Sequence, residues 1–417
     1  MAPFGLTRRC LFAAAMALTL PLALVGPVHA KTSQSQWVTV WSTAQMTPGA
    51  DSALSPADAT DATLRQTIRV AKGGDMIRLR LSNATGTEPL SLRNVHIARA
   101  TITGGSAIDP ASDRPVTFGG LNDIVIPAGA DYISDPISIT VADQSVLAIS
   151  FHMPTGLPQP QTGHPGSRTT SWLVPGDHVS DADLPEAKKF DHWFTIAGLD
   201  IESGSAKAAV VAFGDSITDG YGIKPNSDTR WPDFLGRRLK DRPVSVLNAG
   251  IGGNRLLLDG LGPNAQARFD RDVLSQSGVK YVIVLESVND LGVLTRDAPV
   301  TQAAHDDLVA RLKVAYLQMV TKAHSHGLKI YGGTITPFIG MDYYHPDALN
   351  EADRQAINSW IRTSGAFDAV IDFDAALRDP VQPDRLSSAY DSGDHLHPSS
   401  AGYQAMAEAV DLKLFEN

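Results

Sequence analysis

The chain has 417 residues, 43% of them hydrophobic and 19% charged, which provides ample apolar material for a core and more length than one ordinary domain needs. Its formal net charge of −10 argues against a nucleic-acid partner, because phosphate binding needs a basic surface. That charge leaves small-molecule and polysaccharide substrates open. Cys10 is the single cysteine, so a chain cleaved beyond it has no disulfide, no thiol nucleophile and no cysteine-ligated zinc.

Residues 1–30 have the pattern of a signal peptide. Two arginines precede an apolar run, and a Val-His-Ala tripeptide that fits a cleavage site ends at Ala30. The stretch "TRRCLF" also resembles a twin-arginine signal. A membrane anchor is the alternative, but the run is shorter than the ~20 residues of a span and contains prolines. We therefore expect export to the periplasm or the medium, without stable membrane association.

Residues 31–205 are predicted to be β-rich. Apolar and polar residues alternate, with the period of half-buried strands, in 63–70, 75–83, 94–102, 131–141 and 145–153. Clusters of Gly, Pro, Asn and Asp separate these segments, and no long helical period is present. This pattern predicts an all-β accessory domain of the sandwich or jelly-roll type.

The β-rich region carries no motif that identifies a function. Its long Pro/Gly/Ser-rich loop, residues 153–171, is of a kind that is often functional, and it could reach an active-site cleft. Its tryptophans are either core residues or sugar-binding platforms, and the core is the commoner role: Trp37, Trp41, Trp172 and Trp193. The region therefore either binds a glycan or packs as one wall of the active site.

Residues 206–417 are predicted to form an α/β domain. Continuous apolar runs typical of buried parallel strands occur at 207–214, 244–250, 280–287, 328–337 and 367–374. Amphipathic helical patterns alternate with them at 230–240, 305–327, 350–365 and 399–415. This alternation predicts a doubly wound sheet of about five parallel strands.

The stretch "FGDSITDG", residues 213–220, follows the first strand of this domain directly. Ligands of such sheets bind at the carboxyl ends of the strands, which is where Ser216 is expected. A serine hydroxyl is a weak nucleophile unless a base takes its proton, and a lone serine here is more often a turn or cap residue. A reactive Ser216 therefore requires a base, an orienting acid and an anion site elsewhere in the chain.

The stretch "SGDHLHPSSAGY" offers the base and the acid. Asp394 and His397 are three residues apart in a turn that enters the last helix, a spacing that lets the carboxylate accept a hydrogen bond from Nδ1–H of the imidazole. The Nε2 atom is then free to face a serine. Histidine titrates near neutral pH and can act first as base and then as acid.

Two alternatives compete with this assignment. His395 and His397 form an H-x-H pair that is compatible with a metal site. Asp342 and His345 repeat the Asp-x-x-His-Pro spacing in a loop between a strand and a helix. The position directly before the last helix favours His397 over His345, and we expect neither a metal nor a cofactor.

An oxyanion site could come from two further loops, each after a predicted strand. "NAGIGGNRLL" brings three glycines whose backbone N–H groups can approach a ligand, and "VLESVNDLG" brings the side-chain amide of Asn289. Either loop alone is ordinary turn chemistry. Three polar clusters, each just past a strand, are much less expected by chance.

Together these blocks resemble the SGNH (GDSL-type) hydrolase family, in the family's order: "FGDSITDG", "NAGIGGNR", "SVNDLG" and "DHLHP". The resemblance implies a flavodoxin-like three-layer fold, Ser216 as nucleophile, and Asp394 and His397 as acid and base. It implies oxyanion donors from Gly253, Asn289 and the backbone N–H of Ser216, with no metal or cofactor. It also strengthens the choice of His397 as the base.

The resemblance covers residues 207–417, with one departure, because Ser287 stands where the family has glycine. Thr218 occupies a position where the G-x-S-x-G elbow needs glycine, which argues against an α/β-hydrolase fold. Stretches such as "RWPDFL" and "ARFDRDVL" look closer still to a subfamily of arylesterases and acylhydrolases, some of them associated with xylan breakdown.

The sequence therefore predicts an exported serine esterase that hydrolyses short-chain acyl esters, with acetyl groups on plant polysaccharide as the first choice. A lipase, thioesterase or arylesterase of the same family is the alternative, although the absence of an apolar lid-like helix disfavours long acyl chains. A carbohydrate-binding protein with a vestigial hydrolase half is a third hypothesis.

Overall fold

Five parallel strands form the sheet of the C-terminal half in the computed structural model, which describes residues 36–202 and 204–416. The spatial order is β16-β15-β17-β18-β19, with β15 (Ala208–Gly214), β16 (Val244–Gly250), β17 (Val279–Leu285), β18 (Lys329–Gly333) and β19 (Ala369–Ile371). The first strand in sequence therefore lies inside the sheet, between the second and the third, which is the 2-1-3-4-5 order of doubly wound folds. The predicted α/β fold with a five-stranded parallel sheet is confirmed.

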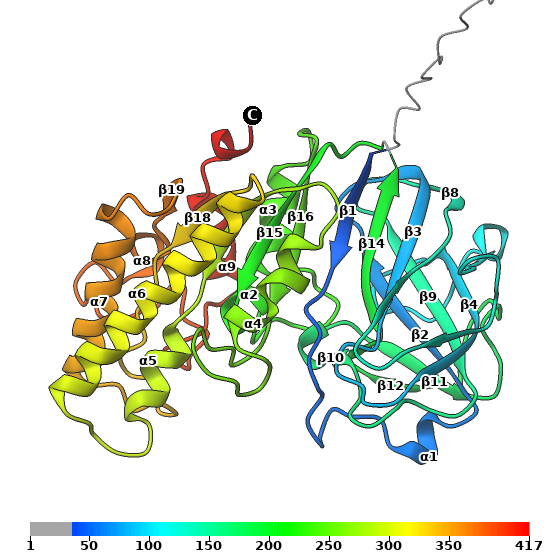
Figure 1. Cartoon of the computed structure of the whole chain (residues 1–417), viewed down its shortest axis with the longest axis horizontal. Coiled ribbons are helices and arrows are strands. Elements are labelled where there is room, and N and C mark those ends of the chain that lie inside the picture. Colours follow the sequence, from blue (N-terminus) through cyan, green and yellow to red (C-terminus); the bar gives the residue numbers. More distant parts are fainter. Residues whose placement is uncertain (1–35, 203, 417) are drawn as a thin grey trace, which may run out of the picture. The chain divides into compact units, whose positions relative to one another are not determined.

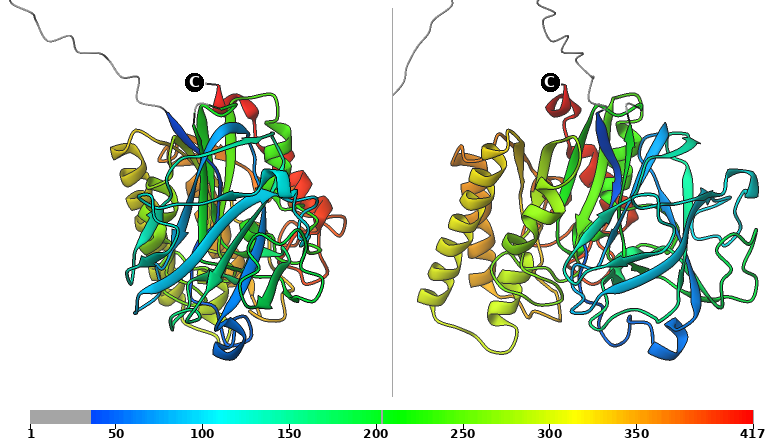
Figure 2. Two further views of the ribbon diagram at one scale, coloured as in Figure 1. Left: turned by 90° about the vertical axis from the view of Figure 1, so that its right-hand side faces the viewer. Right: turned by 45° about the vertical axis from the view of Figure 1, so that its right-hand side comes forward.

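Helices cover both faces of this sheet (Figures 1 and 2). The pair α6 (Gln302–Ser325) and α7 (Ala348–Thr363) pack together on one face, and α3 (Trp231–Arg238) packs with α9 (Ser400–Ala409) on the other. Shorter helices follow the strands: α2 (Ser216–Asp219), α4 (Ala265–Phe269), α5 (Val288–Thr295) and α8 (Phe373–Leu377). Every residue of β15 is buried because helices lie on both sides, which explains its continuous apolar sequence.

The N-terminal half consists of antiparallel sheets, as predicted, and α1 (Pro56–Ala59) is its one α-helix among the described residues. A seven-stranded sheet contains β12 (Lys188–Phe190), β11 (Ser171–Pro175), β2 (Ala62–Arg69), β9 (Val146–Met153), β4 (Leu90–Arg99), β5 (Arg114–Pro115) and β6 (Ile124–Ile126). A five-stranded sheet contains β1 (Trp37–Ser42), β14 (Ile196–Glu202), β3 (Gly74–Ser82), β7 (Asp131–Ile133) and β8 (Ile137–Val141). The jelly-roll arrangement stays a prediction.

Strand β1, at one edge of the five-stranded antiparallel sheet, contacts the parallel sheet at β16. Thr39 N–H donates to the Ser277 carbonyl at 2.9 Å, and Ser277 N–H donates back to Thr39 Oγ1 at 2.9 Å. The buried apolar residues of both halves form one continuous cluster. The β-rich half is therefore packed directly against the α/β half.

Three of the four tryptophans that the sequence leaves open between core and sugar platform are buried: Trp41, Trp172 and Trp193. The rings of Trp41 and Trp193 meet edge to face at 5.1 Å. Trp37 is half-buried, with the Arg78 guanidinium 4.5 Å from its ring centroid. These side chains belong to the packing of the β-rich half.

The predicted signal peptide, residues 1–30, lies outside the described residues. No helix among the residues that the structure describes is both long enough and apolar enough to cross a bilayer.

Candidate active site

Ser216 is the first residue of α2, just beyond the carboxyl end of β15. Its Oγ lies 2.8 Å from Nε2 of His397, which is 181 positions away in the sequence. Both residues are nearly enclosed, at 4% and 6% exposure. Asp215 begins the helix and accepts the N–H of Ile217 at 2.9 Å, which fixes the turn that carries the serine.

The other ring nitrogen of His397 faces Asp394. Nδ1 lies 2.6 Å from Asp394 Oδ2, while Asp394 Oδ1 accepts the backbone N–H groups of His397 at 2.8 Å and Leu396 at 3.0 Å. Burial raises the pKa of Asp394, but the hydrogen bonds from His397 outweigh it and bring the pKa well below its ordinary value. The carboxylate therefore stays ionised and orients the imidazole, leaving Nε2 toward Ser216.

The structure separates the rival histidines from Ser216. His345 is exposed, and its Nδ1 lies 3.4 Å from the Arg296 carbonyl oxygen. His395 is half-exposed, and its Nδ1 pairs with Asp391 at 2.6 Å. Within residues 36–202 and 204–416, no group of three or more His, Cys, Asp or Glu side chains is arranged to hold a metal ion.

The two predicted oxyanion loops begin at the same edge of the sheet as Ser216. Gly214 of β15 pairs in register with Gly250 of β16 and with Leu285 of β17, so the loops after these three strands start side by side. Gly253 lies in the second loop with a φ of +69°, and a Cβ there would come within 2.6 Å of Leu261 Cδ1. Both constraints require glycine at this position.

Asn289 lies in the third loop, and its side chain is fixed at both ends. Nδ2 donates to the Asn254 carbonyl at 2.7 Å, and Oδ1 accepts the Tyr344 hydroxyl at 2.7 Å. An amide has two N–H groups, so one donor of Asn289 remains for a ligand. Tyr344 was missed from the sequence, although it lies in "MDYYHPDALN", the stretch considered there only for His345.

Residues 212–405 match the model of the GDSL-like Lipase/Acylhydrolase family. This half of the chain is a GDSL-like lipase/acylhydrolase domain. The protein is accordingly a carboxylic ester hydrolase. No curated protein matches the chain.

Several solved structures are similar to the GDSL-like domain. They include a G-D-S-L family protein from Desulfitobacterium hafniense, at 24% identity over 48% of this chain and 97% of the other, with a TM-score of 0.37. A lipolytic G-D-S-L family member from Veillonella parvula shares 18% identity over 50% and 99%, with a TM-score of 0.37. A variant of an acetyl xylan esterase from Geobacillus stearothermophilus shares 21% over 49% and 93%, with a TM-score of 0.38.

A buried arginine connects the loops of the GDSL-like domain beneath the site. The Arg268 guanidinium donates to the carbonyls of Gly214 at 2.8 Å and Ala249 at 2.7 Å, and Nε donates to Asn254 Oδ1 at 2.8 Å. It also pairs with Glu286 at 3.2 Å, and both side chains are fully buried. Arg268 therefore joins the ends of β15, β16 and β17 to the Gly253 loop.

Three carboxyl groups surround this arginine, more than one cation can balance. Burial raises the pKa of Asp215 to about 7 and that of Asp290 to about 6, and it raises the pKa of Glu286 well above its ordinary value. Asp290 nevertheless accepts the backbone N–H groups of Leu256 at 2.7 Å and Leu257 at 3.1 Å. The cluster thus positions the Gly253 loop while holding protons above the usual carboxyl range.

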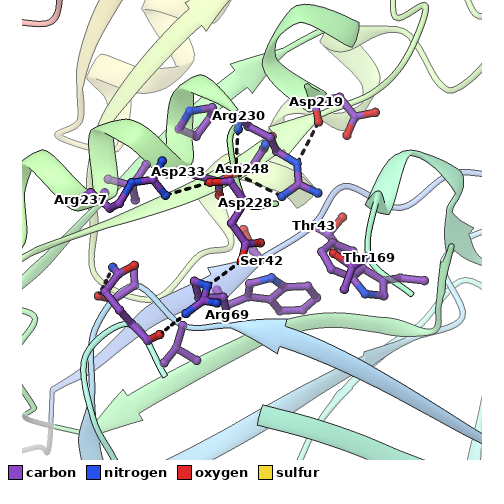
Figure 3. Close-up of a pocket in the computed structure, with 18 of the residues that line it drawn as sticks. Ser42, Thr43, Arg69, Thr169, Asp219, Asp228, Arg230, Asp233, Arg237 and Asn248 are labelled. Carbon is purple, nitrogen blue, oxygen red and sulfur yellow. Dashed lines mark hydrogen bonds and ion pairs between the residues drawn. The ribbon is translucent and has the colours of Figure 1, made fainter. Parts of the chain in front are cut away.

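A polar cavity of about 70 Å³ lies apart from the reacting groups, between β1, β2 and α3 (Figure 3). Its lining does not include Ser216. Its charged groups are paired with one another, as in Arg69 with Asp228 at 2.7 Å and His164 with Asp219 at 2.9 Å. We therefore attribute to this cavity a role in joining the two halves.

Ser287, the departure from the family pattern, has a φ of +89°, in the left-handed region that glycine favours. Its Oγ donates to the Tyr316 hydroxyl at 3.0 Å, and that hydroxyl donates to the Glu286 carbonyl at 2.9 Å. The backbone thus keeps a glycine-type conformation, and the serine side chain gains a buried partner.

The conformation of Ser287 predicts a reversed order of stability between two variants. Ser287→Gly and Ser287→Ala both lose the bond to Tyr316, but only alanine keeps a Cβ in the left-handed region. We expect the glycine variant to be more stable by about 1 kcal/mol. Urea unfolding of both variants measures this difference, and an alanine variant as stable as the glycine variant would contradict the proposed strain.

Asp290 predicts a specific pH dependence of stability. Its folded pKa of about 6 lies above the ordinary value of 3.8, so the folded state binds the proton more tightly than the unfolded state. The stabilisation is complete below the unfolded pKa and is lost as the pH rises through about 6, by at most about 3 kcal/mol. Urea unfolding should therefore show the stability of the natural protein falling relative to Asp290→Asn between acidic and neutral pH; a constant difference would refute this.

Proposed function

We propose that the protein is an exported serine esterase that removes short acyl groups through an acyl-enzyme formed on Ser216. The observation that carries the proposal is the chain of contacts from Ser216 Oγ to His397 at 2.8 Å and from His397 to Asp394 at 2.6 Å. The sequence pattern of residues 1–30 supports export, which stays a prediction.

In the first half-reaction, Ser216 Oγ attacks the ester carbonyl carbon while His397 Nε2 takes the hydroxyl proton. The tetrahedral intermediate collapses, the bond from carbon to the alcohol oxygen breaks, and His397 returns the proton to the leaving alcohol. In the second half-reaction, His397 takes a proton from water, the resulting hydroxide attacks the acyl carbon, and the bond to Oγ breaks as Ser216 regains its proton. The products are a carboxylic acid and an alcohol.

The negative charge of the intermediate needs donors that are already in position. We assign this role to the backbone N–H groups of Gly253 and Ser216 and to the second N–H of Asn289. Asn289 is held at both ends, so it need not reorient during the reaction. Asp394 stabilises the imidazolium that forms on His397.

The enclosure of the reacting groups supports short acyl chains. Ser216 and His397 together expose little surface, which leaves limited space at the reacting carbon. Acetyl esters are therefore the first choice, and the attached β-rich half supports a polysaccharide as the alcohol component. A long-chain lipase or a thioesterase is the alternative within the same chemistry.

Replacing Ser216 tests the reaction class. Ser216→Ala should lower kcat for p-nitrophenyl acetate by a factor of about a thousand or more, because no other group can form the acyl-enzyme. The unmodified protein should also release acetate from acetylated xylan faster than it hydrolyses a long-chain p-nitrophenyl ester. Initial rates of product release measure both effects.

The matched control for this test is a histidine with the same Asp-x-x-His-Pro spacing. His345→Ala should retain activity, whereas His397→Ala should lose it. A fluorophosphonate probe should label the unmodified protein and not Ser216→Ala. Full activity in Ser216→Ala would end the proposal, and an unmodified protein that is neither labelled nor active would favour a carbohydrate-binding protein.

The contact between Tyr344 and Asn289 predicts a positioning role for the tyrosine. Tyr344→Phe removes the hydroxyl that donates to Asn289 Oδ1 at 2.7 Å, and we expect kcat to fall roughly tenfold with a smaller change in KM. Because the tyrosine acts through the amide, the same change should have little further effect in an Asn289→Ala background. Steady-state kinetics of the two single variants and the double variant measure this coupling, and additive losses would exclude it.

A further inference from the structure

The β-rich half places one charged side chain beside the reacting histidine. The segment 163–170 contains β10 (Gly163–His164) and a short 3₁₀ turn (Pro165–Ser167), and Arg168 follows that turn. The Arg168 guanidinium carbon lies 5.2 Å from the centroid of the Tyr221 ring. The Tyr221 ring in turn lies 4.1 Å, centroid to centroid, from the His397 imidazole. A single exposed aromatic ring thus contacts both Arg168 and His397.

The position of this segment is fixed by contacts with the helix that carries Ser216. His164 Nε2 pairs with Asp219 of α2 at 2.9 Å, and its Nδ1 lies 2.8 Å from the Ala44 carbonyl oxygen. Gly166 packs against the same aspartate so closely that a Cβ would lie 1.9 Å from Asp219 Oδ2. The segment is therefore held directly against α2.

Further bonds hold the residues on either side of the Arg168 side chain. Asn226 N–H donates to the Arg168 carbonyl at 2.8 Å, and Thr170 N–H donates to Asn226 Oδ1 at 2.8 Å. Arg230 donates to the Ser167 carbonyl. Arg168 itself has a φ of +47° and a ψ of 33°, a left-handed conformation that costs a residue with a Cβ about 1 kcal/mol or more. These contacts impose the strained backbone that directs the arginine.

The guanidinium of Arg168 lacks the partners that other enclosed arginines of this protein have. Among residues 36–202 and 204–416, no carboxylate forms an ion pair with it, and its Nε is buried without a hydrogen-bond partner. Arg268 and Arg354, by contrast, each donate to several carbonyls and carboxylates. A partly enclosed guanidinium without an anion, beside a reaction centre, is a site for an anionic group of a ligand.

We propose that Arg168 binds a carboxylate on the alcohol component of the ester, so that the preferred substrate is an acylated hydroxy acid such as an acidic sugar. This inference rests on the proposed function. His397 returns its proton to the leaving alcohol, so groups beside His397 lie along the alcohol component. A guanidinium matches a carboxylate through two parallel hydrogen bonds, and the half-exposed Tyr221 ring, at 48% exposure, offers an apolar face for the carbon skeleton between them.

The test compares two acetate esters that differ only in charge, para-carboxyphenyl acetate and its neutral isostere para-carbamoylphenyl acetate. Arg168→Gln should lower the ratio of their kcat/KM values roughly tenfold relative to the unmodified protein, mainly through KM, since charge-assisted hydrogen bonds contribute at least that factor. Arg168→Lys, which keeps the charge without the planar fork, should give an intermediate ratio. Arg93→Gln removes an exposed positive charge elsewhere in the β-rich half and should leave the ratio unchanged.

An unchanged ratio in Arg168→Gln, or an equal loss with both esters, would overturn the proposal in favour of a structural role. If that variant does not fold, the unmodified protein decides: its ratio should fall at high salt, which screens the ion pair, and a salt-independent ratio would refute the proposal. Activity in Ser216→Ala would contradict the proposed function itself. An inactive Ser216→Ala together with an unchanged ratio would contradict only the role of Arg168.

Discussion

The buried guanidinium of Arg268 holds together the strand ends on which the whole site is built. It bonds to carbonyls of β15 and β16, to Glu286 just after β17, and to Asn254 in the loop that contains Gly253. A buried charge is tolerated only when such partners surround it. Because one rigid planar group bonds to all of them, irregular polar loops can leave neighbouring strands without losing their mutual alignment.

The nucleophile and its proton acceptor come from opposite ends of this domain. Ser216 follows the inner strand β15, whereas His397 precedes α9, which packs beside α3 on one face of the sheet. The Tyr403 hydroxyl of α9 donates to the Tyr221 carbonyl at 2.8 Å and so fastens the last helix to the chain just past Ser216. The 2.8 Å contact between hydroxyl and imidazole is a consequence of this helix packing.

The β-rich half takes part in the same construction. Its His164 forms a buried pair with Asp219 of α2, at 2.9 Å, three residues beyond Ser216. The same segment presents Arg168 to Tyr221. An accessory region that contacts the nucleophile's own helix can shape which esters reach it, whereas a region joined only by a linker could influence just the local concentration of substrate.

The sequence by itself determined the α/β class, the strands that end near reacting groups, and the local unit formed by Asp394 and His397, because hydrophobic periodicity and close spacing are properties of short segments. Only the tertiary structure decided that Tyr344 holds Asn289, that Arg168 faces Tyr221, and that Ser287 adopts the backbone of a glycine. Each of these depends on contacts between residues far apart in the chain. Such contacts form only when the packing of whole elements brings their surfaces together, and no short stretch of sequence encodes that packing.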